Sequence, residues 1–469
     1  MKTGKALWVS GATPGSETDD GPWESEREAA SPGDHSADFI SALFSGGDSR
    51  IAADPRTGLN KYLCPVVPAP NLICVSSCTA SPISVQGFDR AAAAFSDIMR
   101  AATPVRRARR LAALTDQIKE RLLQYFGAGA LARVILCPSG TDAMLTTAML
   151  MAAERPGEPL TAILPSASET GTGVPLAVVC RTFDGPDSGT PLIGGAGTTV
   201  EIPLRSADAS PLPENAVNDA FAAAAAVAKG GVVVYLTHGT KTGLIAPVSP
   251  PHGVDVVVDA CQARIEPETV AAYLRRGWPV VVTGSKFFGG PAFSGAILFP
   301  LAQLPAVVPH PRRSAPREAA GLGTALRWTA ALATIDAFQP LAAGMAATLA
   351  DRAAAIERAI ASNPRLVPVG GLRAGGPGWA GVPGIFTFAV RDPVDRGRLL
   401  SAAELRLLHE RLAHMGVLLG QPVGLGSFGG LRIAIGARDL LGWQGDGCLA
   451  RVFAALEEAT SPSRLGDGR

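Results

Sequence analysis

The chain has 469 residues, 47% hydrophobic and 18% charged, so it can bury a large core in about two to four domains. Its 42 Lys and Arg residues against 41 Asp and Glu residues give a formal net charge of +1. A basic cluster at residues 106–110 falls on one predicted helix. This balance disfavours nucleic acid or a polybasic membrane surface as a partner.

The seven cysteines are scattered and form no Cys-x-x-Cys pair, so neither a disulfide framework nor a metal site is predicted. Cys74 and Cys78 are spaced to face one another on a helix, but two thiols without further ligands are more often small buried hydrophobic residues. Residues 1–30 lack an apolar signal segment, and the longest apolar run, 220–236, is interrupted at 229–231. We therefore expect a soluble, cytoplasmic protein without a membrane partner.

In chain order, residues 11–36 are rich in Gly, Ser, Pro, Glu and Asp, which is typical of a mobile arm; an arm that folds over a partner subunit is the alternative. A helix is predicted over 105–126 from its apolar periodicity, with Pro104 suited to a helix start. Short apolar runs then alternate with amphipathic stretches, as a parallel α/β sheet requires. The predicted strands cover residues 133–137, 160–164, 176–181, 231–237, 254–259, 279–283 and 295–299.

Residues 301–316 form a Pro-rich connector, and an Ala-rich helix over 324–360 with an interruption at Pro340 follows. The later elements are predicted as strands at 385–390 and 431–434 and helices at 402–415 and 447–460. We expect an α/β fold, with a mostly parallel seven-stranded sheet that carries helices on both faces, and a smaller C-terminal α+β domain. The predicted organisation is an arm at 1–57, a large domain at 58–305 and a small domain at 306–469.

Ser139, Gly140 and Thr141 follow the first predicted strand and precede a helix over 142–152. Backbone N–H groups at a helix start, with two hydroxyl groups beside them, form a cradle for an anion. The same residues are also an ordinary helix N-cap. This motif alone is therefore a weak signal.

Asp259 ends an apolar strand, and Lys286 lies in the loop after the next predicted strand. Ligands of open α/β sheets bind at the carboxyl ends of the strands. Because a buried carboxylate is costly without a cationic partner, Asp259 should face one, such as a pyridinium N–H; capping of the next helix is the alternative. Lys286 is flanked by aromatic residues and glycines, which favours a partly desolvated, nucleophilic amine, although an exposed loop lysine is commoner.

These motifs, in this order, resemble those of the fold type I pyridoxal-phosphate enzymes, in the class V aminotransferase and cysteine desulfurase branch. The likeness covers residues 133–300 and includes the segment 238–247. It implies pyridoxal 5′-phosphate as the cofactor, joined to Lys286 as an aldimine. It further implies that Asp259 pairs with the pyridine nitrogen and that Gln262 hydrogen-bonds the ring hydroxyl.

The resemblance also places the phosphate of that cofactor. The loop of Ser139, Gly140 and Thr141 matches the family's phosphate loop. Thr283 or Ser285 would add a further contact to the phosphate.

Two matches lie in the second half of the chain. Residues 318–324 are similar to the family's Gly-Thr segment, with which a neighbouring subunit contacts the phosphate. This likeness implies a homodimer with the active site between subunits and a phosphate contact by Thr324. An N-cap by Thr324 is the alternative. Arg432 stands in a strand similar to the one whose arginine clamps the substrate α-carboxylate. A guanidinium suits a planar carboxylate, while an ordinary surface arginine is the alternative.

The chain departs from the family pattern at residues 165–173. The family places a His or an aromatic residue over the pyridine ring there, and this segment has no ring. Either Glu169 or Thr170 covers the cofactor, or that face is open to a bulky substrate; an alignment shifted by a few residues is the alternative.

The resemblance implies an enzyme that acts on an amino-acid substrate through external aldimine and quinonoid intermediates, with Lys286 as the general base. The open 165–173 segment favours β- or γ-elimination or replacement, for example of a sulfur or sulfonium amino acid with a second substrate. An aminotransferase is the alternative, and a non-catalytic binding module is disfavoured because Asp259, Gln262 and Lys286 are all present. A dinucleotide-binding protein is disfavoured too, because no acidic ribose partner follows the glycine cluster at 194–197.

Overall fold

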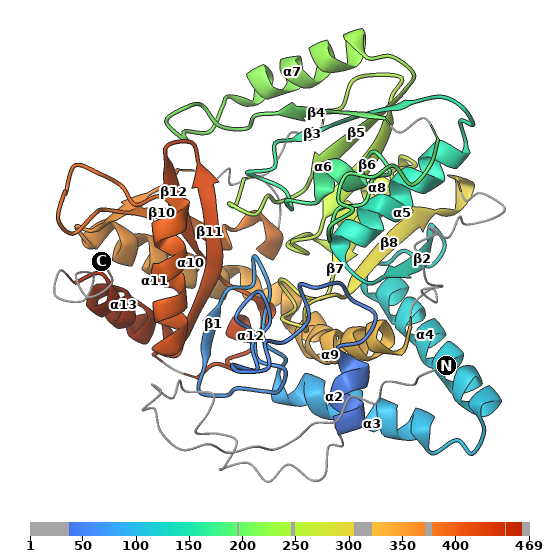
Figure 1. Ribbon diagram of the computed structural model, residues 1–469, viewed down its shortest axis with the longest axis horizontal. Coiled ribbons are helices and arrows are strands. Elements are labelled where there is room, and N and C mark those ends of the chain that lie inside the picture. The colour runs from blue at the N-terminus through green and yellow to red at the C-terminus, as the bar shows by residue number, and fades with distance from the viewer. Residues whose placement is uncertain are drawn as a thin grey trace.

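The computed structural model describes residues 37–194, 197–244, 249–303, 321–370, 378–445 and 447–461. Within these residues the main chain forms a seven-stranded and a five-stranded sheet, which lie on the right and the left of the view in Figure 1. The predicted arm at 11–36 and most of the predicted connector at 301–316 lie outside the described residues. No helix in the described ranges combines the length and apolarity that a membrane crossing needs.

The larger sheet has the strand order β2-β8-β7-β6-β5-β3-β4 in the described part of the chain. Neighbouring strands from β4 to β7 pair in parallel, while β8 runs antiparallel to both β7 and β2. The mostly parallel sheet expected from the sequence is therefore confirmed. Its strands are β2 (Ala132–Cys137), β3 (Leu160–Pro165), β4 (Thr198–Ile202), β5 (Gly231–Thr237), β6 (Asp255–Ala260), β7 (Val280–Thr283) and β8 (Gly295–Pro300).

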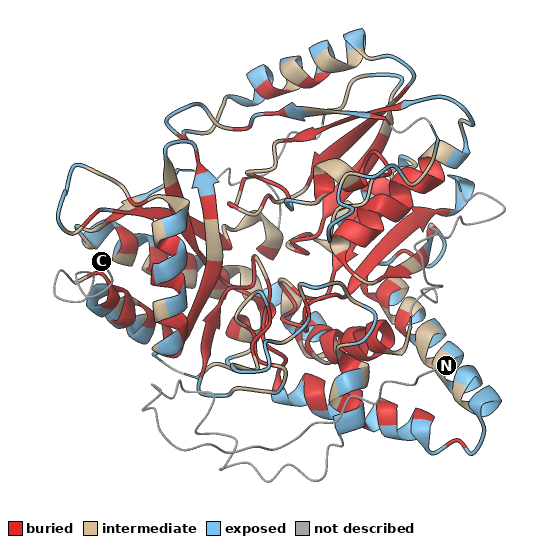
Figure 2. Cartoon of the chain, in the orientation of Figure 1, coloured by how far each residue is buried: buried red, intermediate tan, exposed pale blue. Residues whose placement is uncertain are grey.

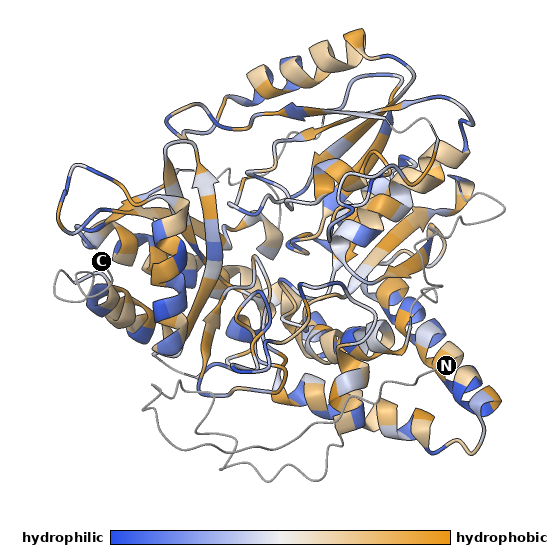
Figure 3. Ribbon diagram, in the orientation of Figure 1, coloured by the Kyte–Doolittle hydropathy of each residue, from blue (hydrophilic) through white to orange (hydrophobic). Residues whose placement is uncertain are grey.

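The central strands are apolar on both faces, which Figure 3 shows as orange segments within the sheet. Because side chains alternate along a strand, Val257 and Val281 pack under α5 (Gly140–Ala153), while Val258 and Val282 face the opposite core. That opposite core includes α4 (Pro104–Tyr125) and α8 (Pro267–Arg275). Figure 2 shows the central strands and α5 buried along most of their length.

The predicted strand at 176–181 is wrong. The short helix α6 (Val174–Ala177) occupies part of this segment, Pro175 stands in its first turn, and Cys180 has a φ of 56°. The positive φ of Cys180 is incompatible with an extended run, and Pro175 favours the start of a helix just before it. The seventh strand is instead β4, whose partly exposed edge position explains why it has no continuous apolar run.

The smaller sheet has the order β1-β11-β12-β10-β9 within the described residues. Strands β10 and β12 match the prediction, whereas β11 was not predicted because a bulge between Gly420 and Val423 breaks its pattern. β1 pairs in parallel with β11 although it stands far earlier in the chain. The strands are β1 (Ile73–Val75), β9 (Leu366–Pro368), β10 (Ile385–Val390), β11 (Val417–Leu425) and β12 (Phe428–Ala434).

The predicted Ala-rich helix is interrupted at Pro340, as expected, by a 3-10 turn at Gln339–Gly344. The first half of this segment is α9 (Leu322–Phe338). It contacts α2 (Ala37–Leu43), α3 (Val85–Met99), α4 and α12 (Ala437–Leu440). The domain boundaries inferred from the sequence stay a prediction. The remaining helices are α2 (Ala37–Leu43), α3 (Val85–Met99), α7 (Glu214–Val227), α9 (Leu322–Phe338), α10 (Met345–Ser362), α11 (Ala402–His414), α12 (Ala437–Leu440) and α13 (Cys448–Ala459).

Candidate active site

A cavity of about 250 Å³ lies at the carboxyl ends of the parallel strands, where α/β sheets bind their ligands. The loops after β2, β6 and β7 and the strand β12 all contribute to its lining. The structure thus brings together most of the residues singled out in the sequence. Those that line the cavity are Ser139, Gly140, Thr141, Thr170, Asp259, Thr283, Ser285, Lys286 and Arg432.

The N-terminus of α5 forms one wall of the cavity. Ser139 caps the helix: its hydroxyl accepts the N–H of Asp142 at 3.1 Å and donates to the carboxylate of Asp142 at 2.7 Å. The first helical turn leaves the N–H groups of Gly140 and Thr141 without an intrahelical acceptor. A Cβ on Gly140 would lie 2.8 Å from the Cys261 sulfur, so the close approach of this turn to β6 requires glycine. The N-cap is therefore confirmed, and the use of this turn as an anion cradle stays a prediction.

Asp259 and Lys286 stand at the ends of the adjacent strands β6 and β7. The Asp259 carboxylate is buried and accepts the Cys261 N–H at 3.0 Å. Thr283 ties the two strand ends together, because its hydroxyl donates to the Cys261 carbonyl at 2.7 Å. Lys286 is half-buried, and no hydrogen bond or ion pair joins its amine to another residue of the described part of the chain.

Arg50 also lines the cavity and was missed by the sequence reasoning, which placed it in the N-terminal arm. Its guanidinium pairs with Asp48 at 2.6 Å and lies 5.0 Å from the centre of the Phe293 ring. Burial lowers the pKa of Arg50, but hydrogen bonding to Asp48 and the electrostatic interactions with Tyr62, Asp48 and Asp142 together outweigh it, so the pKa lies above its ordinary value. Its electrostatic interaction with Asp142 places this permanent charge near the start of α5.

Arg432 of β12 lines another part of the cavity, here called the Arg432 end, with residues from three other segments. Its guanidinium donates to the Gln421 carbonyl at 3.1 Å, to the Lys241 carbonyl at 2.9 Å and to the Thr79 hydroxyl at 2.9 Å. The Gln421 N–H in turn donates to Thr79. These acceptors hold the buried guanidinium in one orientation at the cavity wall.

Lys241 is a second lysine of the cavity that the sequence reasoning did not select. Its ammonium group donates to the Ala167 carbonyl at 2.6 Å, and its backbone N–H donates to the Glu169 carbonyl at 3.0 Å. Burial, followed by the nearby charge of Arg432, lowers the pKa of Lys241 to about 7. The signal was present, since Lys241 follows the end of β5 as Lys286 follows the end of β7.

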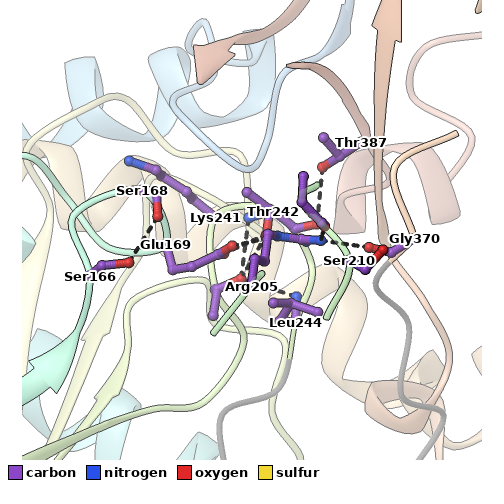
Figure 4. Close-up of polar contacts among 12 residues, drawn as sticks. Ser166, Ser168, Glu169, Arg205, Ser210, Lys241, Thr242, Leu244, Gly370 and Thr387 are labelled. Carbon is purple, nitrogen blue, oxygen red and sulfur yellow. Dashed lines mark hydrogen bonds and ion pairs between the residues drawn. The ribbon is translucent and has the colours of Figure 1, made fainter. Parts of the chain in front are cut away.

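Glu169 and Thr170 take different positions in the 165–173 segment. Glu169 is not among the residues that line the cavity and pairs with Arg205 at 2.7 Å, where the two side chains are 0% and 7% exposed (Figure 4). Thr170 lines the cavity, and its buried hydroxyl has no hydrogen-bond partner among the described residues. The aromatic residues of the lining are Tyr62 and Phe293, which come from other segments.

Besides Glu169, two more residues singled out in the sequence do not line this cavity. The Gln262 amide donates to the Cys78 carbonyl at 3.1 Å and accepts from Arg264 at 3.1 Å, so both of its ends are engaged elsewhere. Thr324 is buried near the start of α9, where its hydroxyl accepts from Arg327 at 3.2 Å. A contact from Thr324 to a neighbouring subunit stays a prediction.

No protein-family profile matches the chain, and no curated protein matches it. Solved structures do. The cysteine desulfurase CsdA from Escherichia coli is 16% identical with a TM-score of 0.53, and the match covers 83% of this chain and 94% of that one. The cystine C–S lyase C-DES, in complex with its product cysteine persulfide, is 15% identical with a TM-score of 0.56 and coverages of 84% and 98%.

A NifS-like protein matches as well, at 11% identity and a TM-score of 0.53, with coverages of 82% and 99%. The chain has the fold of these enzymes. The fold that the sequence resemblance implied is therefore confirmed, over nearly the whole length of each matching structure.

Proposed function

We propose that the chain is a pyridoxal-phosphate-dependent enzyme that acts on an amino acid. The observation that carries the proposal is the convergence of a helix N-terminus, a buried carboxylate and an unpaired lysine on one cavity. The shared fold supports it, since one structure of C-DES has glycine covalently linked to its pyridoxal-phosphate cofactor.

The residues present fit such a cofactor. The N–H groups of Gly140 and Thr141, with the hydroxyl of Ser285, suit a phosphate group. The Thr170 hydroxyl, buried without a partner among the described residues, needs an acceptor or donor such as the cofactor. Asp259 would face the pyridine nitrogen, and the amine of Lys286 would hold the aldehyde carbon.

When bound, the cofactor supplies an electron sink for the bonds at the substrate Cα. The chain's own residues bind and orient the substrate and move its protons. The Lys286 amine, released from the cofactor by the substrate, would take the Cα proton as a general base. Arg432, held by its three acceptors, would fix the α-carboxylate and so determine which Cα bond is broken.

For the reaction type we propose β- or γ-elimination or replacement, with a sulfur or sulfonium amino acid as a candidate substrate and room for a second substrate. The 165–173 segment supports this because it presents Thr170 rather than a ring to the cavity. Cleavage of a C–S bond by the similarly folded C-DES supports it as well. Transamination is the competing outcome, and a homodimer located in the cytoplasm remains part of the proposal.

The test begins with the purified protein, which should carry a yellow cofactor. Reduction with borohydride should fix the cofactor to Lys286, as peptide mass spectrometry would show, and Lys286→Ala should lower activity by about 10²–10⁴-fold. A colourless wild-type protein reconstituted with pyridoxal phosphate, or label on another lysine, would contradict the proposal. A non-catalytic binding module would bind the cofactor but convert no amino acid.

The reaction type is separated by the products from a panel of amino acids. Release of a thiol, a thioether or ammonia, with the starting cofactor regenerated, supports elimination or replacement. Accumulation of the pyridoxamine form together with a keto acid supports transamination.

A further inference from the structure

The cavity carries more positive charge than the proposed cofactor and an α-carboxylate require. Its acidic lining residue in the described part of the chain is Asp259. Against this one carboxylate stand several cations. They are Arg50, Lys61, Lys241, Lys286 and Arg432.

Three of these cations already have a counterpart. Arg50 is neutralised by Asp48 and lies near the start of α5, at the proposed phosphate end. Lys286 is assigned to the cofactor aldehyde and Arg432 to the substrate α-carboxylate. Lys61 and Lys241 are left without an anionic partner in this assignment.

Both remaining lysines belong to the end of the cavity formed by Arg432. The Lys241 carbonyl accepts directly from the Arg432 guanidinium at 2.9 Å. The Lys61 carbonyl accepts at 2.9 Å from the side chain of Gln421, whose own carbonyl accepts from Arg432. Both lysines line the same cavity as Arg432, and the charge of Lys241 interacts with that of Arg432, so a substrate held there by its α-carboxylate lies near them.

Lys241 is the better placed of the two. Its ammonium group makes one hydrogen bond, to the neutral Ala167 carbonyl, which leaves two N–H donors for a ligand. Lys61 is exposed. A partly buried ammonium paired only with a neutral carbonyl is unfavourable, and a bound anion would compensate for this cost. Burial and the charge of Arg432 lower the pKa of Lys241, and the nearby carboxylate of Glu169, which is paired with Arg205, offsets this only in part.

We propose that the substrate is an amino acid with a second anionic group on its side chain, and that Lys241 binds this group. Lys61 adds a weaker, solvent-screened attraction at the mouth of the cavity. The inference rests on the proposed function and narrows its substrate to acidic amino acids. A carboxylate and a phosphate share the required chemistry.

The test compares matched pairs of amino acids on the cofactor-loaded protein, with dissociation constants taken from the change in the visible spectrum. The pairs are L-aspartate with L-asparagine, L-glutamate with L-glutamine, and O-phospho-L-serine with L-serine. The acidic member of at least one pair should bind about tenfold tighter or more, as expected for a charged hydrogen bond. The pair with the largest ratio distinguishes a carboxylate from a phosphate.

Variants then assign the preference to one residue. Lys241→Met should reduce the acidic-to-neutral ratio towards one, whereas Lys241→Arg should retain most of it. Lys119→Met removes the same charge from the exposed face of α4 and should leave the ratio unchanged. Melting temperatures show whether each variant is folded; if Lys241→Met is not, a ratio retained in Lys241→Arg supports the proposal and a lost ratio contradicts it.

Failure of this inference and failure of the proposed function give different results. If the loaded protein has no visible cofactor, or no amino acid changes its spectrum, the proposed function is wrong. If amino acids change the spectrum but neutral members bind as tightly as acidic ones, or if Lys241→Met keeps the preference, only the acidic substrate is overturned.

Discussion

The two ends of the cavity are formed by different kinds of chemical group. The end near α5 consists mainly of backbone N–H groups and short hydroxyl side chains, with Arg50 beside them, and its spacing is set by the close packing of Gly140 against Cys261 and Thr283. The end near Arg432 consists of long cationic side chains from separate segments, and hydrogen bonds to backbone carbonyl groups hold Arg432 and Lys241 in place. Main-chain donors suit a group that is the same in every reaction cycle, whereas long side chains can be exchanged to change the substrate.

An ion pair accompanies each end: Arg205 and Glu169 at the Arg432 end are almost fully buried, whereas Arg50 of the pair with Asp48 at the α5 end is more exposed. Arg205 pairs with Glu169 and also donates to the Thr242 hydroxyl at 2.9 Å and to the Gly370 carbonyl at 2.6 Å (Figure 4). Thr387 of β10 donates to the Thr242 carbonyl at 3.0 Å. The ion pair therefore links the loop that carries Lys241 to the region of the smaller sheet.

The largest expected effect comes from breaking this ion pair. Glu169→Ala should lower the free energy of unfolding by about 3–5 kcal/mol, because Arg205 would keep a charge in a site that is almost closed to water. Denaturant unfolding measures the change. Asp116→Ala, which breaks the exposed pair with Lys119, should cost no more than about 0.5 kcal/mol. Equal losses in the two variants would show that the buried pair does not support the Arg432 end.

The next effect tests the main-chain end. A Cβ on Gly295 of β8 would collide with the Ser139 carbonyl group, so Gly295→Ala should displace the start of α5. We expect a loss of about 1–3 kcal/mol in stability and weaker retention of pyridoxal phosphate during dialysis. Gly129→Ala meets no atom within 4 Å and serves as the control. Normal cofactor retention in Gly295→Ala would contradict the assigned phosphate end.

The smallest effect is a pH dependence confined to the Arg432 end. Burial lowers the pKa of Lys241 to about 7, and an anion binds only its charged form. The preference for acidic over neutral amino acids should therefore be greatest below pH 7 and fall above it, by up to about tenfold per pH unit. Arg432 from β12, Lys286 after β7 and Glu169 after β3 also face this group.

The substrates' own groups titrate differently in the two members of a pair, so the wild-type ratio is divided by the Lys241→Met ratio at each pH. This quotient should be greatest below pH 7 and fall above it. A quotient that does not vary with pH would show that a group other than Lys241 recognises the substrate side chain.

Local patterns predicted the α5 end and the sheet well. The apolar runs that form β2, β3 and β5–β8 are short and bounded by polar residues, so the sequence indicates where each of these strands begins and ends. Ser139, Asp259 and Lys286 each follow one of these runs, and parallel strands carry such residues to a single edge. The failures at 176–181 and at β11 occurred where proline and a bulge interrupt the period on which the prediction depended.

The sequence by itself determined which functional side chains stand at the ends of which strands, because hydrogen bonding and apolar alternation act over a few residues. The tertiary structure alone decided that Arg50 and Thr79 join the cavity, that Gln262 is engaged outside it, and that Arg205 closes on Glu169. Those contacts join segments far apart in the sequence. They form only when packing of the two sheets brings long side chains within reach of buried acceptors. The periodic pattern of apolar residues within one helix or strand does not determine the distance between such segments.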